Sequence, residues 1–312
     1  MNLWLQKVDA KLNNLTPVYT IRADGYAAQI AAFGGGVKSL TFRGAPLVET
    51  YDGFPPLAAG VVLAPWPNRI ADGTYTWRGE RHQLPITEPE RNNAIHGFVA
   101  DRVWECVSHS VGSVTLAVNI APQAGYPWFV RLVARYALGR DGLTATFHAE
   151  SPHPEVPYAF GWHTYLTAGG APTDTCRLTL NTTTDVELDG ARNLPTGVER
   201  PAQFKDAAVA GLELDHCFSA PTGVRAELAD AHGLRTRLEC SGDVRWAQVY
   251  TPHDYPGRGR AIAVEPMSAP PNAFATGTGV RTLPATDWVR LSAADTGTAA
   301  DTGFFGHGNV EN

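Results

Sequence analysis

One carboxylate in the sequence stands where a carboxylate is costly. Glu265 follows the apolar run AIAV and precedes a proline in Ala261–Phe274, AIAVEPMSAPPNAF, so its neighbours place it near a core or a closed cleft. A carboxylate in such a place is unfavourable unless it is paired or used. Loss of water would raise its pKa toward the working pH, as a general base requires. A structural glutamate bridged to an arginine is the alternative.

Two histidines stand in similarly unusual surroundings. His163 lies among aromatic residues in Tyr158–Leu166, YAFGWHTYL, and His96 lies in an asparagine-rich segment before Gly97. A lone histidine among aromatic residues is more often a core residue. One acidic group together with two imidazoles, however, suits proton transfer near neutral pH. Glu265, His163 and His96 are therefore the candidate catalytic residues.

Polar and aromatic residues near these segments are candidates for binding. Asn68 and Arg69 are candidate binding residues. Arg69 follows Pro67 and Asn68, a context that fits a fork of donors aimed into a cleft, although a surface ion pair is the alternative. Asp215 is either an acceptor for sugar hydroxyls or a structural carboxylate in a turn. Trp66 and Trp162 are candidate stacking platforms, because aromatic faces pack well on the C–H faces of sugars. Core packing would explain both tryptophans equally well.

Other kinds of site lack their sequence signals. Two histidines and a carboxylate could bind a metal, but no HxH, HxxxH or HExxH spacing is present, and we expect neither a metal nor a cofactor. No GxSxG elbow of a serine hydrolase occurs. The glycines of Phe33–Leu40, FGGGVKSL, precede no helix and match no phosphate loop, so they indicate a tight turn between early strands.

Composition limits the partner and the compartment. The formal charge is −6 and the 25 basic residues are scattered, which argues against a nucleic-acid or membrane partner and favours a small neutral molecule. The four cysteines, Cys106, Cys176, Cys217 and Cys240, are far apart and are expected to be free thiols. No apolar stretch is long enough to span a membrane. We expect a cytoplasmic monomer or homodimer.

Short alternating runs separated by turn signals predict an all-β fold. The clearest runs are Val114–Ile120, Arg131–Leu138, Leu143–Ala149 and Leu234–Cys240. Their close spacing is typical of an antiparallel sandwich or barrel. With 31 glycines and 23 prolines, only Met1–Leu12 reads as weakly helical, and Ala202–Ala210 as a short helical turn. Residues 1–292 are expected to form one domain, and residues 293–312 a flexible tail.

The sequence resembles the aldose 1-epimerase, or galactose mutarotase, family. Four stretches carry the resemblance and occur in the family's order: PNRIADGTYTWRGERHQLPITEPERNNAIHG, GWHTYL, LDHCF and AVEPMSAPPNAF. Together they extend the resemblance over roughly residues 20–292. Two segments depart from the family's usual pattern: His163–Leu166 reads HTYL where the family has an HPYF-like segment, and Leu283–Thr286 reads LPAT. These departures place the chain in a divergent branch.

The resemblance implies a large antiparallel β-sandwich, often called a supersandwich, with a monosaccharide bound in an open cleft. It implies that Glu265 is the general base, His163 the general acid and His96 the second active-site histidine. Arg69 and Asp215 match groups that hold the hydroxyls and oxygens of the sugar. The expected activity is the interconversion of the α and β anomers of free hexoses, without a cofactor.

Several rival functions are possible on the same fold. A hexose-6-phosphate 1-epimerase would need additional cationic groups for the phosphate, and Asp215 would repel it. A non-catalytic sugar-binding module would have little need for a desolvated acid and base. A sugar isomerase acting at C2, or a carbohydrate lyase, rests on analogy of fold alone.

Overall fold

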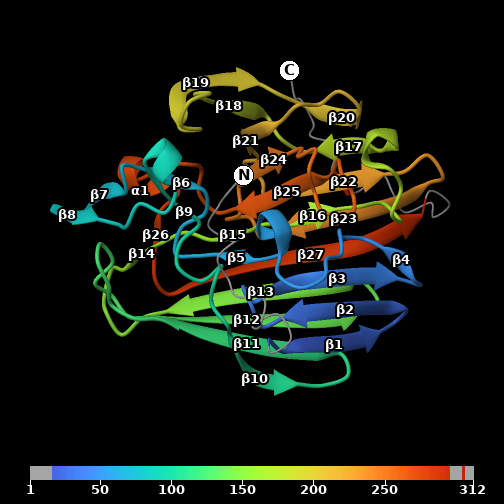
Figure 1. The fold of residues 1–312 in the computed structure, drawn as a ribbon, viewed down its shortest axis with the longest axis horizontal. Helices are drawn as coiled ribbons and strands as arrows, with labels where there is room; N and C mark the ends of the chain where they lie inside the picture. The colour runs from blue at the N-terminus through green and yellow to red at the C-terminus, as the bar shows by residue number, and fades with distance from the viewer. Residues whose placement is uncertain (1–15, 296–303, 306–312) are drawn as a thin grey trace, which may run out of the picture.

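The computed structural model describes residues 16–295 and 304–305, and its strand pairs are antiparallel throughout (Figure 1). The largest sheet has nine strands, in the spatial order β10 (Glu105–His109), β11 (Ser113–Ile120), β12 (Val130–Gly139), β13 (Gly142–Glu150), β27 (Ala285–Asp295), β23 (Leu234–Cys240), β22 (Arg225–Ala229), β17 (Arg177–Leu180) and β20 (Phe204–Ala208). Strands β12 and β13 are joined by a tight hairpin, as the turn signal at Arg140–Gly142 predicts, whereas a longer loop connects β11 to β12.

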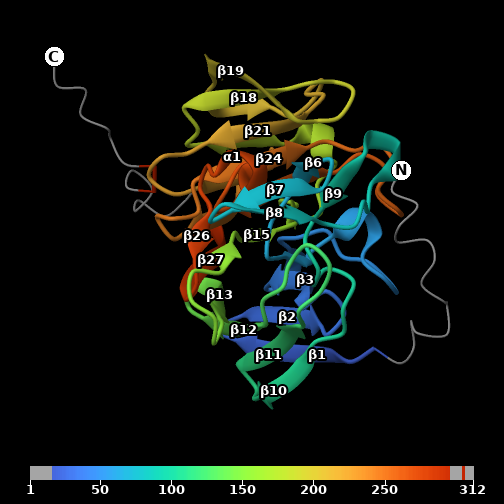
Figure 2. The ribbon, with the colours of Figure 1, turned by 90° about the vertical axis from the view of Figure 1, so that its left-hand side faces the viewer.

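Two further sheets pack against the nine-stranded one. The eight-stranded sheet contains β19 (Pro195–Pro201), β18 (Thr184–Leu188), β21 (Asp215–Ser219), β24 (Trp246–Tyr250), β25 (Ile262–Met267), β15 (Gly161–Trp162) and β5 (Val62–Leu63), with β16 (Tyr165–Leu166) also paired to β25. The four-stranded sheet contains β1 (Val18–Ala23), β2 (Tyr26–Ala31), β3 (Gly36–Phe42) and β4 (Ala45–Pro46). Strands β1 and β2 contact β12, and the β18–β19 hairpin and β10 mark opposite ends of the molecule (Figure 2).

Short elements connect these sheets. The two-stranded pairs are β6 (Arg69–Ala71) with β9 (Asn93–Ile95), β7 (Thr74–Trp77) with β8 (Glu80–Gln83), and β14 (Pro157–Tyr158) with β26 (Arg281–Thr282). Helical structure in the described residues is confined to α1 (Ala273–Thr276) and three 3₁₀ turns, Pro56–Ala58, Pro89–Arg91 and Thr173–Thr175. The β6–β9 pair brings the two ends of the Pro65–Gly97 segment together.

Alternation of apolar residues explains the shared core. Strands β12, β13 and β23 bury alternate side chains, and the main cluster of buried residues draws on all three large sheets. Rings from two layers meet there: Phe147 of β13 packs against Phe160, with centroids 4.5 Å apart, and against Trp162 of β15. The four cysteines are free, and the described residues include no helix that is long and apolar enough to cross a membrane.

The sequence predicted the fold class and the four clear strands correctly. The glycines at Phe33–Leu40 form the expected turn between β2 and β3. The helical turn expected at Ala202–Ala210 is wrong, because Phe204–Ala208 pairs with β17 as strand β20. Strand β27 continues to Asp295, so residues 293–295 belong to the sheet and not to a tail. The helix expected at Met1–Leu12, and the rest of the tail apart from 304–305, lie outside the described residues.

Candidate active site

Three neighbouring strands of the eight-stranded sheet form the floor of a cavity of about 280 Å³. Asp215 of β21 lies opposite Tyr250 of β24, and Gln248 of β24 lies opposite Glu265 of β25. Residues 248 and 250 share a face because side chains alternate along a strand. All four side chains therefore line the same cavity.

The remaining walls come from distant parts of the chain. They include polar residues of the Pro65–Gly97 segment, His163, and several aliphatic side chains. The residues that complete the lining are Leu57, Ala58, Val61, Asn68, Arg69, Glu88, Glu90, Arg91, Ile95, His96, Ala100 and His163. The cavity thus combines an apolar flank with a polar, charged floor, the composition typical of small-molecule sites.

Glu265 and His163 form a buried acid–base pair. His163 Nε2 lies 3.2 Å from Glu265 Oε1, and both side chains are less than one tenth exposed. Burial, together with the nearby Asp215 carboxylate, raises the pKa of Glu265 well above its usual range, and the charge of Arg69 offsets only part of this. Burial lowers the pKa of His163 to about 3. The protein interior therefore disfavours charge on both partners.

Two polar atoms of this pair lack a hydrogen-bond partner among the described residues. Glu265 Oε2 and His163 Nδ1 are buried, and neither makes a hydrogen bond within the part of the chain that the structure describes. Most buried polar side-chain atoms in proteins are hydrogen-bonded, and both of these unpaired atoms belong to residues that line the cavity, where a ligand could supply the missing partner.

The backbone fixes His163 between β15 and β16. Its amide donates to Val61 O at 3.0 Å, and its carbonyl accepts from the amide of Gly60 at 2.7 Å. The preceding Trp162 ends β15 with its side chain in the core, while His163 lines the cavity. Adjacent residues of an extended chain face opposite sides, so this aromatic segment anchors the histidine from behind.

His96 is held by Asn68. The amide of Asn68 donates to His96 Nδ1 at 3.3 Å, and the amide of His96 donates to Asn68 O at 3.0 Å. Burial and the nearby His163 and Arg69 hold the pKa of His96 well below its usual value. A neutral imidazole whose Nδ1 accepts must carry its proton on Nε2, so His96 presents a donor.

The residue after His96 must be a glycine, because the backbone there passes close to Ala64. The backbone of Gly97 has φ +71°, and a Cβ on it would lie 2.0 Å from Ala64 O. Only glycine fits such a contact, which explains why the histidine is followed by a residue without a side chain.

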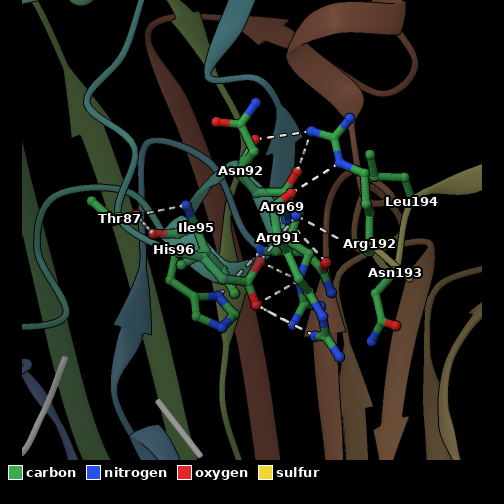
Figure 3. Close-up of polar contacts among 12 residues, drawn as sticks. Arg69, Thr87, Arg91, Asn92, Ile95, His96, Arg192, Asn193 and Leu194 are labelled. Carbon is green, nitrogen blue, oxygen red and sulfur yellow. Dashed lines mark hydrogen bonds and ion pairs between the residues drawn. The ribbon is translucent and has the colours of Figure 1, made fainter. Parts of the chain in front are cut away.

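Arg69 is anchored by a buried carboxylate, Glu88. Its Nε donates to Glu88 Oε2 at 2.8 Å and its Nη2 to Glu88 Oε1 at 2.9 Å. Figure 3 shows Arg69 beside Arg91 and Asn92, with Arg192 of the neighbouring turn bonded to the same loop. Arg69 lines the cavity as the sequence predicted, and its ion pair is buried instead of lying at the surface.

Asp215 is held from two sides. Gln248 Nε2 donates to its Oδ1 at 2.7 Å, and Asn193 Nδ2, from the β18–β19 turn, donates to its Oδ2. The carboxylate thus faces the cavity in a fixed orientation. Asp215 begins strand β21, so the alternative that it is a structural carboxylate in a turn does not fit its position.

The two predicted tryptophan platforms are wrong. Trp66 is 2% exposed and packs against Phe98 and Phe274, and Trp162 is fully buried with its Nε1 donating to Gly60 O at 2.8 Å. Neither lines the cavity, because the core needs both rings. The aromatic residue that does line it is Tyr250.

Several site residues were missed by the sequence analysis. Glu88 precedes the 3₁₀ turn Pro89–Arg91 and Asn193 lies between β18 and β19, in connections where polar residues are ordinary. Gln248 and Tyr250 lie on β24, where alternation was the only available signal. Asn272, within AVEPMSAPPNAF, accepts from the amide of Ala71 at 3.0 Å and so braces β6. Asn272 lies within a motif that carries the family resemblance, which is the signal in the sequence that marks this residue. Among the described residues, no group of three or more histidines, cysteines and carboxylates is arranged to hold a metal.

Comparisons with known proteins identify the family of the chain. The family model for aldose 1-epimerase matches residues 17–288. The protein YihR of Escherichia coli K12, described as uncharacterized, is 34% identical over 268 residues, which are 83% of this chain and 86% of YihR.

Solved structures show the same fold at low identity. A GalM/aldose epimerase homologue from Caenorhabditis elegans superposes with a TM-score of 0.77 at 20% identity, covering 90% of this chain and 99% of the other. A galactose 1-epimerase from Lactobacillus acidophilus gives 0.74 at 18% identity, with coverages of 88% and 93%. With the family model matching nearly the whole described sandwich, the chain belongs to the aldose 1-epimerase family.

Proposed function

We propose that the protein is an aldose 1-epimerase that interconverts the α and β anomers of a free hexose. The observation that carries this proposal is the buried Glu265–His163 pair, with 3.2 Å between its nearest atoms, beside His96 in the cavity. The two oxygens that exchange protons in the reaction, O1 and O5, are bonded to the same carbon. An acid and a base that serve them must therefore lie close together.

In the proposed reaction Glu265 takes the proton of the anomeric hydroxyl. The C1–O1 bond gains double-bond character, the C1–O5 bond breaks with its electron pair on O5, and O5 takes a proton from His163. The resulting aldehyde rotates about C1–C2 and recloses by the reverse steps, which form the other anomer and return both protons. The enzyme ends in its starting state, so no redox or group-transfer partner is consumed.

The pair must carry one proton to act in this way. Burial favours the form with that proton on Glu265, and the reactive form is the one in which the proton has moved to His163, so that a base and an acid are both present. A second proton removes the base, and loss of the proton removes the acid. Two such closely spaced groups titrate as a unit. The kcat/KM of the enzyme should therefore fall on both sides of an optimum pH.

Other residues are assigned to positioning the sugar. His96 Nε2–H is proposed to donate to the ring oxygen or to O1 as charge develops. Glu88 accepts hydrogen bonds from Nε and Nη2 of Arg69. The third nitrogen, Nη1, makes no hydrogen bond to any residue that the structure describes, and we assign it as a donor to a sugar hydroxyl. Asp215, oriented by Gln248 and Asn193, is proposed to accept from sugar hydroxyls.

The charge balance of the cavity supports a neutral substrate. Two arginines, Arg69 and Arg91, face a larger set of carboxylates, and Glu88 binds both of them. A phosphate would have to displace Glu88 or approach Asp215, and both are unfavourable.

Polarimetry on freshly dissolved sugars tests the proposal. α-Glucose, α-galactose, xylose, arabinose and glucose 6-phosphate are each followed with and without protein, and the uncatalysed rate is subtracted. We expect acceleration with at least one free aldose and no faster use of the phosphate. If only glucose 6-phosphate were accelerated, the substrate would be a sugar phosphate and not a free hexose. If no sugar were accelerated, the proposed activity would be overturned.

A further inference from the structure

We propose that Glu88 is a positioning residue that fixes both the orientation and the effective charge of Arg69 in the cavity. The inference rests on the proposed function, because the position of Arg69 matters to turnover only if a sugar binds beside it.

The contact between the two side chains is a buried fork. Both oxygens of Glu88 accept from Arg69, at 2.8 Å from Nε and 2.9 Å from Nη2, and the glutamate side chain is 3% exposed. Paired donors and acceptors of this kind fix the plane of a guanidinium as well as its place. The third nitrogen, Nη1, is thereby given a single direction relative to the cavity.

The carboxylate is itself rigidly held. Asn93 Nδ2 donates to Glu88 Oε2 at 3.0 Å, and the backbones of Glu88 and Asn93 exchange hydrogen bonds at 3.0 and 3.2 Å. Asn93 Nδ2 also donates to the carbonyl of Arg192, on the turn that carries Asn193. On the other side, the amide of Asn272 donates to Arg69 O at 2.7 Å. Both partners are thus fixed from opposite sides before any ligand arrives.

Glu88 also compensates charge near the acid–base pair. Burial alone would raise the pKa of Glu88, but the hydrogen bonds and charge of Arg69, with those of Asn93 and Arg91, outweigh it and hold the pKa below its usual value. The carboxylate therefore stays ionised, and its negative charge lies directly against Arg69, whose positive charge acts on Glu265.

Several titratable groups share this environment. His163 lies against Glu265, Asp215 disfavours the ionised form of Glu265, and Arg69 favours it. The other groups that interact electrostatically with Glu265 are Tyr165, Tyr250 and Cys217, whose pKa values are raised and which stay neutral. Of these groups, only Arg69 supplies a fixed positive charge. Loss of the negative charge at Glu88 would leave that charge uncompensated and make the pair lose its proton more readily.

The test compares three variants with the wild type. Glu88→Gln removes the charge and one acceptor, and Glu88→Asp keeps the charge but shortens the side chain. Glu155→Gln is the matched control, because Glu155 forms an ion pair with Arg78 at the surface, where both side chains are more than half exposed. For each variant KM, kcat and the pH profile of kcat/KM are measured by polarimetry, with circular dichroism as a check on folding.

For Glu88→Gln we expect KM to rise about tenfold or more and the alkaline limb of the pH profile to move by about half a unit or more to lower pH. Glu88→Asp should raise KM but leave that limb at the wild-type position, and Glu155→Gln should match the wild type throughout.

If Glu88→Gln matches Glu155→Gln, or if Glu88→Asp moves the limb as far as Glu88→Gln does, the role of Glu88 is overturned while the activity stands. Should Glu88→Gln fail to fold, an unchanged KM in Glu88→Asp overturns it. An inactive wild type would overturn the proposed function and this inference together.

Discussion

At the scale of single residues, the proposed chemistry depends on burial acting in opposite directions on the pKa values of two groups. Desolvation raises the pKa of Glu265 and lowers that of His163, because each loses stability as an ion. The sequence predicted this trio from residue types in unusual surroundings. It could not predict that Glu265 and His163 contact each other, nor that Glu88 holds Arg69, because both contacts join segments far apart in the chain.

The first prediction concerns the pH dependence of wild-type turnover. Because the active pair carries one proton, kcat/KM should follow a bell-shaped curve. Its acid limb should lie well below the usual histidine pKa, since burial lowers the pKa of His163 to about 3. Its alkaline limb should lie well above the usual carboxyl pKa, since burial and Asp215 raise the pKa of Glu265. Polarimetric rates across pH, corrected for the uncatalysed reaction, measure both limbs. A profile that rises through a pKa near 6.5 would contradict the shared-proton account.

The second prediction concerns the binding groups. Arg69→Ala and Asp215→Asn should each lower kcat/KM for free hexoses by about 10- to 100-fold, because each removes a charged hydrogen-bonding partner. Asp185→Asn is the matched control, since Asp185 contacts His216 at 3.3 Å outside the cavity. Equal kinetics for Asp215→Asn and Asp185→Asn would remove Asp215 from the proposed site. Glucose 6-phosphate should not become a better substrate in any of these variants.

At the scale of elements, the strands of the large sheet follow from alternation and the short strands do not. Runs such as Val114–Ile120 contain enough apolar periodicity to identify β11. Strands β6 and β9 have three residues each, too few for any period, and exist because they pair with each other. β20 was mistaken for a helical turn, because its residues are largely exposed and the pairing with β17 overrides their local preference.

The third prediction tests the turn after β9. Gly97→Ala should lower the free energy of unfolding by roughly 3 kcal/mol or more, because it adds a steric clash with Ala64 O to the strain of positive φ. Gly79→Ala is the matched control: Gly79 has φ +85°, and a Cβ there would meet nothing within 4 Å. It should cost about 1 kcal/mol. Denaturant unfolding measures both changes, and equal losses would show that the close approach of Gly97 to Ala64 is not what constrains this turn.

At the scale of the whole molecule, the fold gathers five separated segments into one cavity. Asp215, Gln248 and Glu265 come from adjacent strands, while His163 and the Pro65–Gly97 segment arrive through long connections. The sequence predicted the sandwich because alternation and turn signals are local properties. It assigned Trp66 and Trp162 wrongly, because whether a ring faces the core or a cleft is decided by packing between sheets.

The fourth prediction concerns cofactors. The proposed reaction moves only protons between the sugar and side chains of this chain, so exhaustive dialysis and chelators should leave the rate unchanged. The polarimetric rate before and after treatment with EDTA measures this. Restoration of a dialysed, inactive sample by a divalent metal would require a different mechanism.

The central claim is that Glu265 exchanges a proton with the anomeric hydroxyl, and Glu265→Gln tests it most directly. Glutamine keeps the size of the side chain but cannot accept that proton, so sugar should still bind while kcat falls about 10²- to 10⁴-fold, roughly 3–5 kcal/mol of transition-state stabilisation. His163→Gln should cause a similar loss, and the double variant should lose less than the sum, because the two groups share one proton. Circular dichroism and sugar binding check that the fold and the cavity survive. A folded Glu265→Gln variant that keeps more than about a tenth of wild-type turnover, a loss under about 1.4 kcal/mol, would contradict the account.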